Sequence, residues 1–170
     1  MSPTVSPEPR AMRPAMQEYG ISEESAGLLP WRFAVQYLSA ARNYWISTTR
    51  PDGRPHAAPV WGVWLNNVFY FGTGPGSVKA HNLRANPALV VHLESGDDVV
   101  ILEGTAEWLT EIDPALWQEI ADQYAVKYDG FRPELPSPQG PFVALRPRVA
   151  FGWQEQDFPL SATRWVFANE

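Results

Sequence analysis

The chain has 170 residues, a formal net charge of -6, and a composition in which 45% of residues are hydrophobic and 13% aromatic. This composition predicts one globular domain, not a disordered chain or a membrane-spanning one, and the negative charge disfavours DNA or RNA as a partner. Cysteine is absent, which excludes disulfides, thiolate nucleophiles and iron–sulfur clusters.

The first 25 residues are predicted to form a flexible N-terminal arm, followed by a single domain at 26–170. Prolines recur among polar residues before position 15, and no apolar stretch of signal-peptide length precedes Tyr19. We therefore expect a cytoplasmic protein. The arm is either disordered or packed on a partner subunit.

Helices and strands are expected along the rest of the chain from hydrophobic periodicity and turn residues. A proline suited to a first helical position begins the first helix, and a Ser-Gly-Asp turn separates two of the strands. The predicted helices are 30–42, 77–85 and 113–127, and the predicted strands are 44–49, 55–65, 68–71, 88–93, 99–108, 142–146, 149–153 and 163–167.

Strands outnumber helices in this prediction, which favours a mainly β fold: a closed or partly closed antiparallel barrel with flanking helices. The second strand contains Pro55 and Pro59, neither of which has a backbone N–H to donate. We expect this strand to lie at an edge, to bend, or to open toward a ligand.

The glycine-rich loop from Gly72 to Lys79 has the parts of a phosphate site. It precedes a predicted helix and combines free backbone N–H groups, the hydroxyl of Ser77 and the ammonium of Lys79. The loop lacks the Gly-Lys-Ser/Thr of a Walker loop, and its glycines alternate at 72, 74 and 76, which excludes the dinucleotide fingerprint. An ordinary connection in which Ser77 only caps the helix is the alternative. The chain has two lysines, Lys79 and Lys127, so Lys79 does not belong to a lysine-rich surface.

The three histidines are expected on different elements, His56 and His92 on strands and His81 on a helix. None of them forms a short pair of the kind that binds zinc, so no metal site is predicted. His56 stands on the proline-interrupted strand, where a ligand can replace missing ladder bonds. The alternative for His56 is a packed or solvent-facing imidazole.

Several motifs in their order along the chain resemble the pyridoxamine phosphate oxidase-like split barrels, in particular the flavin- and deazaflavin-dependent oxidoreductases. The resemblance runs from about residue 30 to 108 and continues more weakly to 165. The motifs are Tyr44-Trp45-Ile46-Ser47-Thr48, Asp52-Gly53-Arg54-Pro55-His56, Pro59-Val60-Trp61, Phe71-Gly72-Thr73, Ser77-x-Lys79, Asn82-Leu83-x-x-Asn86-Pro87 and Glu103-Gly104.

This resemblance implies a six-stranded antiparallel Greek-key barrel that forms a homodimer with two cofactor sites at the interface. Ser77 and Lys79 would hold the cofactor phosphate, with Asn82 beside them. The resemblance also assigns residues to the ring and to the ribityl or phosphate end. These are His56 and the main chain of Pro59, Val60 and Trp61 at the ring edge, Thr73 at the ribityl or phosphate end, and Trp153 or Arg164 from the other subunit.

The resemblance and the absence of thiol, metal and acid/base chemistry together predict that the reactive atom belongs to a bound ring. The expected activity is hydride transfer between FMN or an 8-hydroxy-5-deazaflavin coenzyme and a small organic acceptor, with no catalytic side chain assigned. The basic residues that the vitamin oxidase uses for its phosphates are missing, which disfavours pyridoxine oxidation. A non-catalytic flavin or deazaflavin carrier is the alternative, and a haem-binding split barrel is a weaker one because the histidines give no axial pair.

Overall fold

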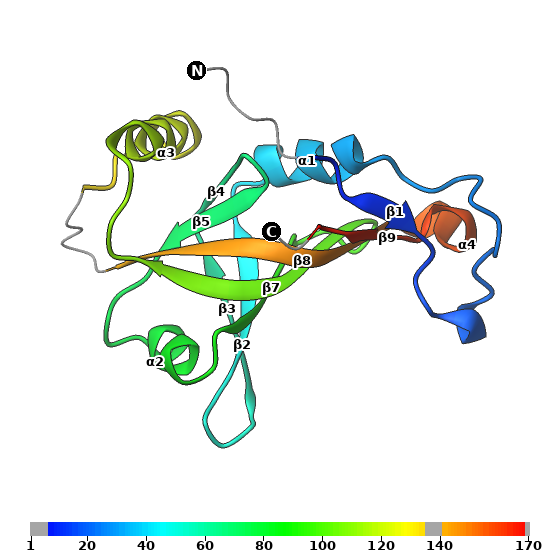
Figure 1. The fold of residues 1–170 in the computed structure, drawn as a ribbon, viewed down its shortest axis with the longest axis horizontal. Coiled ribbons are helices and arrows are strands. Elements are labelled where there is room, and N and C mark those ends of the chain that lie inside the picture. The colour runs from blue at the N-terminus through cyan, green and yellow to red at the C-terminus, as the bar shows by residue number, and fades with distance from the viewer. Residues whose placement is uncertain (1–6, 135–140, 169–170) are drawn as a thin grey trace.

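The structure is a computed structural model that describes residues 7–134 and 141–168 (Figure 1). Antiparallel strands form one sheet, and helices flank it. The elements are β1 (Arg10–Met12), η1 (Gln17–Tyr19), α1 (Trp31–Ala40), β2 (Tyr44–Thr49), β3 (Pro55–Val60), β4 (Val63–Leu65), β5 (Val68–Gly72), α2 (Val78–Ala85), β6 (Ala88–His92), β7 (Asp98–Leu109), α3 (Pro114–Lys127), β8 (Phe142–Gln154), η2 (Glu155–Asp157), α4 (Phe158–Ser161) and β9 (Thr163–Val166).

The sheet has the strand order β1-β9-β8-β7-β6-β2-β3, and β8 also pairs with β5, which pairs with β4. The two halves of β8 therefore serve different neighbours: residues 142–145 pair with β5, and residues 149–152 pair with β9. All of these pairings are antiparallel. The predicted fold class, mainly antiparallel β with flanking helices, is confirmed.

The sequence predicted two short strands where the structure has the single strand β8. Glu103 pairs with Val149 while Gly104 pairs with Pro147, so Arg148 is an extra residue and forms a bulge. A bulge leaves one residue without ladder bonds, which is where a proline is tolerated within a sheet. The predicted interruption is therefore a bend inside one strand and not a loop.

The segment predicted as one strand from 55 to 65 is divided into β3 and β4 by Trp61 and Gly62. A Cβ atom on Gly62 would lie 2.3 Å from the ring of Phe69, so the bend packs closely against β5. Since Trp61 and Gly62 lie outside the strands, their backbone groups are available to other elements.

Two hydrophobic clusters fill the molecule. The larger one lies between α1 and the sheet, around Trp31, Phe69 and Trp165, and the smaller one lies between α3 and β4, β5 and β8. In Figure 1, α2 and α3 flank the end of the sheet where β8 begins. Among residues 7–134 and 141–168, no helix has the length and apolar content needed to cross a membrane.

Part of the N-terminal arm is attached to the sheet. Strand β1 pairs with β9, and the Arg13 guanidinium donates hydrogen bonds to four backbone carbonyls at positions 24, 26, 160 and 162. Residues 1–6 of the predicted arm lie outside the described residues. Residues 10–13 therefore hold the arm against the C-terminal end of the domain.

We expect Gly104→Ala to lower the free energy of unfolding by about 1–3 kcal/mol, the usual cost of overpacking. A Cβ atom there would lie 2.3 Å from the carbonyl oxygen of Arg146 and 2.8 Å from the Leu145 side chain. The matched control is Gly96→Ala, because nothing lies within 4 Å of a Cβ atom at Gly96. Urea unfolding measures both variants, and equal stabilities would contradict the close β7–β8 approach.

Candidate functional site

The glycine-rich loop is folded back on itself before α2. The hydroxyls of Thr73 and Ser77 share a hydrogen bond of 2.9 Å, and the Ser77 hydroxyl also accepts a 3.2 Å bond from the Ala80 N–H. Ser77 is therefore the N-cap of α2, as one of the sequence hypotheses held. These contacts fix the loop at the positive end of the helix dipole.

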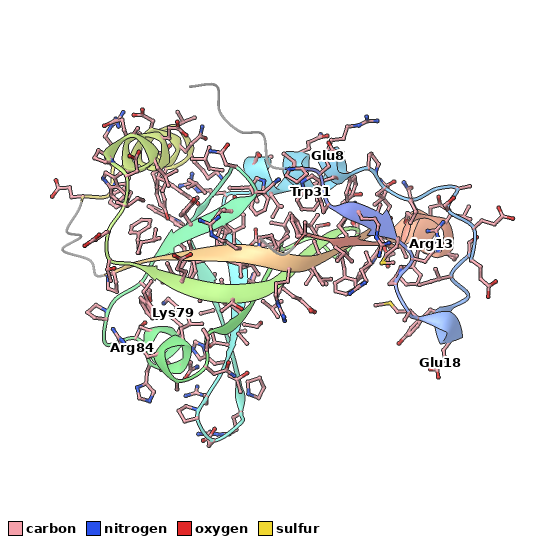
Figure 2. All side chains as sticks on the ribbon, viewed as in Figure 1. Glu8, Arg13, Glu18, Trp31, Lys79 and Arg84 are labelled. Carbon is pink, nitrogen blue, oxygen red and sulfur yellow. The ribbon has the colours of Figure 1, made fainter. Side chains whose placement is uncertain are left out.

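Lys79 lies in the first turn of α2 and is partly exposed. The ion pairs of the described residues involve arginines only, so within this part of the chain the Lys79 ammonium has no carboxylate partner. Figure 2 shows Lys79 and Arg84 on α2, at the opposite end of the molecule from Arg13. A cation without a protein counter-charge is available to an anionic ligand.

Two cavities are lined in part by the loop. We call the first the aromatic cavity; its volume is about 280 Å³, and it is lined by Pro59, Val60, Trp61, Gly72, Thr73, Gly74, Lys79, Tyr124, Phe131, Pro133 and Phe142. We call the second the basic cavity; its volume is about 530 Å³, and it is lined by Arg50, Pro51, Asp52, Arg54, Pro75, Gly76, Ser77, Val78, His81, Asn82 and Arg84.

The structure brings together half of the predicted site residues in the aromatic cavity. These five are Pro59, Val60, Trp61, Thr73 and Lys79. Ser77 and Asn82 instead line the basic cavity. The remaining three, His56, Trp153 and Arg164, line neither cavity.

Asn82 fixes α2 to the sheet. Its side chain is 1% exposed, and its amide donates a 2.9 Å hydrogen bond to the Thr48 hydroxyl on β2. The Thr48 hydroxyl lies 3.5 Å from Nδ1 of His56 on β3. The Asn82 amide is thus engaged inside the protein, and His56 lies on the same buried side of β2 as Thr48.

Trp153 and Arg164 lie on β8 and β9, away from α2 (Figure 1). Arg164 is paired with Phe151 in the sheet register, and its guanidinium lies 3.2 Å from the Met12 sulfur. Residues that are directly paired across antiparallel strands share one face of the sheet. One row on the outer face consists of Pro59, Trp45, His92, Ile101, Phe151, Arg164 and Met12.

Helix α3 supplies Tyr124 to the aromatic cavity, and Tyr128 at its C-cap supports the cavity wall; the sequence analysis assigned neither to the site. The Tyr124 hydroxyl donates a 3.3 Å hydrogen bond to the Trp61 carbonyl, and the Trp61 indole stacks on Tyr128 with centroids 4.4 Å apart. The Tyr128 hydroxyl lies 2.8 Å from both the N–H and the carbonyl oxygen of Gly62. The bend between β3 and β4 is therefore held by α3, and it forms a wall of the cavity.

Lys127 is the second lysine, and its amine lies behind this wall. It donates a 2.6 Å hydrogen bond to the Tyr44 hydroxyl and lies 3.4 Å from the Gly62 carbonyl oxygen. It also lies 4.9 Å from the centre of the Tyr44 ring, a cation–π distance. Burial lowers the pKa of the Lys127 amine to about 8 and raises the pKa of the Tyr44 phenol.

The aromatic cavity is suited to holding a planar, partly anionic molecule. Its walls are mainly aromatic and proline side chains, and the lining residues with polar side-chain groups are Thr73, Lys79 and Tyr124. Among the described residues, no group of three or more His, Asp or Glu side chains is placed to hold a metal ion. The cavity therefore offers a ligand apolar contacts and one cation.

The family model for pyridoxamine 5'-phosphate oxidase matches residues 32–154. The chain belongs to this family. The resemblance on which the sequence analysis relied is therefore confirmed. A search of curated proteins finds no match.

Several solved structures share the fold of this chain. A conserved hypothetical protein of Mycobacterium tuberculosis is 24% identical, with 74% of this chain and 84% of that one covered and a TM-score of 0.62. An F420 reductase is 25% identical, with 68% and 94% covered and a TM-score of 0.51. A pyridoxamine 5'-phosphate oxidase-related, FMN-binding protein of Nostoc punctiforme is 20% identical, with 84% and 92% covered and a TM-score of 0.55.

We expect the stability of the protein to rise with pH between about 8 and 9.5. In this window the folded Lys127 amine loses its proton while the unfolded one, with a pKa near 10.4, keeps it, and stability rises wherever the unfolded state binds more protons. Below about pH 8 the Lys127 amine is charged in both the folded and the unfolded protein, so the full cost of burying the ammonium remains. Urea unfolding across this range measures the effect.

The matched controls for this test are two lysine variants. Lys127→Met is expected to flatten the rise, whereas Lys79→Met keeps it, because Lys79 is partly exposed. The same pH dependence in Lys127→Met and the unaltered protein would contradict the assignment of the rise to this amine.

Proposed function

We propose that the protein is a flavin- or deazaflavin-dependent oxidoreductase, which transfers hydride between the bound coenzyme and a small organic acceptor. The observation that carries this proposal is the aromatic cavity beside the glycine-rich loop and Lys79. Family membership supports it, as do the F420 reductase and the FMN-binding protein among the structures of the same fold. The coenzyme is FMN or 8-hydroxy-5-deazaflavin, and the residues present suit both.

The described residues fit such a coenzyme in three respects. The Lys79 ammonium offers an ionic hydrogen bond to a phosphate, and the loop amides lie at the start of α2, where an anion is favoured. The Trp61 and Phe131 side chains line the cavity and would give the ring apolar contacts. Pro59 and Val60 line the same cavity, and their main chain is proposed to orient the ring edge.

When bound, the coenzyme supplies the hydride chemistry, and the protein binds, orients and shields it. Helix α3 keeps the Trp61 wall in place through the Tyr124 and Tyr128 hydroxyls. A fixed Trp61 wall would hold the coenzyme ring in one orientation toward the acceptor. Such positioning accelerates hydride transfer, because the reacting groups are already aligned.

We further propose that the protein is a homodimer whose second subunit completes the site. The aromatic cavity of one chain, about 280 Å³, lies just below the usual range for ligand pockets, roughly 300–1,000 Å³. The outer sheet face carries half-buried Trp45, Ile101 and Phe151 in a row that also contains His92 and Arg164, and this mainly apolar row is suited to covering by a second copy. Trp153 and Arg164 lie on that side of the sheet, so a partner subunit can bring them to the coenzyme.

Titration with FMN and with the deazaflavin coenzyme, followed by ligand fluorescence, tests the binding function. Stopped-flow mixing of the reduced complex with a panel of acceptors then separates a reductase from a carrier that binds without turnover. Accelerated reoxidation by at least one acceptor supports the reductase. Binding without any acceleration supports the carrier, and no binding of either coenzyme at micromolar concentration contradicts both.

We expect Lys79→Gln to weaken coenzyme binding by about 1.5–3 kcal/mol, or roughly ten- to a hundred-fold, because it removes a hydrogen bond to a charged phosphate. The control is Arg32→Gln, which removes an exposed cation on α1, far from α2 (Figure 1). Calorimetric or fluorescence titration measures both dissociation constants. Unchanged affinity of Lys79→Gln for the coenzyme would contradict the phosphate contact and show that Lys79 is an ordinary surface residue.

We expect Ile101→Glu to convert the dimer to a monomer, because it places a carboxylate beside Phe151 in the middle of the outer row, where no arginine is directly paired with it. The control is Val126→Glu on α3, where the side chain is 85% exposed. Light scattering gives the mass of each variant, and circular dichroism verifies the fold. An Ile101→Glu variant that remains dimeric places the interface on another face.

A further inference from the structure

The N-terminal arm contacts the part of the chain that carries Trp153 and Arg164. Met12 on β1 is paired with Arg164 on β9, and its sulfur lies 3.2 Å from the Arg164 guanidinium. The next residue, Arg13, bonds to the chain around α4, which lies between Trp153 and Arg164 in the sequence. Two consecutive residues of the arm therefore bear on the two side chains proposed to reach the partner's coenzyme.

Arg13 clamps α4 between two segments of the chain. Its Nη1 donates hydrogen bonds of 2.6 and 2.9 Å to the carbonyl oxygens of Leu160 and Ala162. Its Nε and Nη2 donate bonds of 2.8 and 2.6 Å to the carbonyl oxygens of Glu24 and Ala26. The planar guanidinium thus holds residues 24–26 against the end of α4, a role that needs its fork of donors.

Helix α4 is in turn tied to the end of β8, where Trp153 lies. The Ser161 side chain is 2% exposed, and its hydroxyl accepts a 2.9 Å bond from the Gln154 N–H and donates a 3.1 Å bond to the Gln154 carbonyl. The Phe158 ring meets the Trp153 indole edge to face, with centroids 5.6 Å apart. A helix of four residues is not stable alone, so these contacts determine its position.

Arg13 lies far from the candidate site of its own chain. Figure 2 shows it beside α4, at the opposite end of the molecule from Lys79. Arg13, Trp153 and Arg164 line neither the aromatic nor the basic cavity. Any effect of Arg13 on a bound coenzyme therefore has to reach the site of a second copy of the chain.

We infer that Arg13 is a positioning residue for the coenzyme site of the partner subunit, because it holds α4 and, through α4, the Trp153 side chain. This inference rests on the proposed homodimer and its coenzyme. Side chains that are ordered before binding lose less entropy when a ligand contacts them, so the clamp contributes to affinity without touching the coenzyme. The N-terminal arm is thereby assigned a role in binding.

Hydrogen exchange and coenzyme titration of Arg13→Gln test the two halves of this inference. We expect faster exchange in residues 153–163 without coenzyme, an unchanged dimer mass by light scattering, and coenzyme affinity lowered about ten-fold. The matched control is Arg10→Gln, an exposed position of the same strand, which should change none of these. Unchanged exchange, unchanged affinity or a monomeric Arg13→Gln would each contradict the positioning role.

A mixed dimer shows on which subunit Arg13 acts. One chain carries Arg13→Gln and the other Lys79→Gln, with different affinity tags for purification. If Arg13 acts on the partner's site, one of the two sites combines an intact Lys79 with an intact Arg13, and half of the sites bind coenzyme with normal affinity. If Arg13 acts within its own chain or through general unfolding, no site binds normally and the inference is wrong.

Ser161→Ala breaks the same chain of contacts at α4, and it replaces Arg13→Gln in both experiments if that variant fails to fold. We expect the same faster exchange and the same complementation in the mixed dimer. Failure of the unaltered protein to bind either coenzyme would contradict the proposed function itself. Normal binding by the unaltered protein, with no loss in Ser161→Ala or Arg13→Gln, would contradict only the inference about the arm.

Discussion

The attachment of α2 to the sheet is the constraint on which the candidate site depends. One buried hydrogen bond joins the Asn82 amide to the Thr48 hydroxyl, and a second bond, between Thr73 and Ser77, closes the loop that precedes the helix. A buried amide left without its partner costs about 1–3 kcal/mol, so this bond holds α2 in one position. Because the loop is fixed there, Lys79 lines the aromatic cavity and Arg84 lines the basic cavity.

A second constraint acts on the opposite wall of the aromatic cavity. The chain leaves the sheet at Trp61 and Gly62, and two tyrosine hydroxyls and one lysine amine from α3 contact the backbone there. Burial of the Lys127 ammonium opposes folding at neutral pH, and its bond to the Tyr44 hydroxyl offsets part of that cost. Helix α3 therefore determines the shape of the cavity as well as covering the smaller core cluster.

Local chemistry made much of this structure predictable from the sequence. Ser77 caps α2 as expected, and Asn66 and Asn67 adopt the positive φ angles, 53° and 61°, of a tight hairpin turn. The sequence also located the glycine-rich loop before α2, and the coenzyme role of Lys79 stays a prediction. Features set by long-range contacts were not predictable from the sequence. The bulge at Arg148 depends on how β8 pairs with β7. The sequence indicates only that Tyr124 is a core residue, because its contact with Trp61 depends on the bend between β3 and β4. Trp153 and Arg164 do not meet the cavity within one chain, so their predicted role depends on a second subunit.

The central claim is that the glycine-rich loop and Lys79 hold the phosphate of a redox coenzyme. A crystal structure of the protein grown with FMN or with the deazaflavin coenzyme tests it most directly. The account predicts a phosphate within hydrogen-bonding distance of the Lys79 amine and the loop amides, with the ring against Trp61. A coenzyme bound away from this loop, with Lys79 facing solvent, would contradict it.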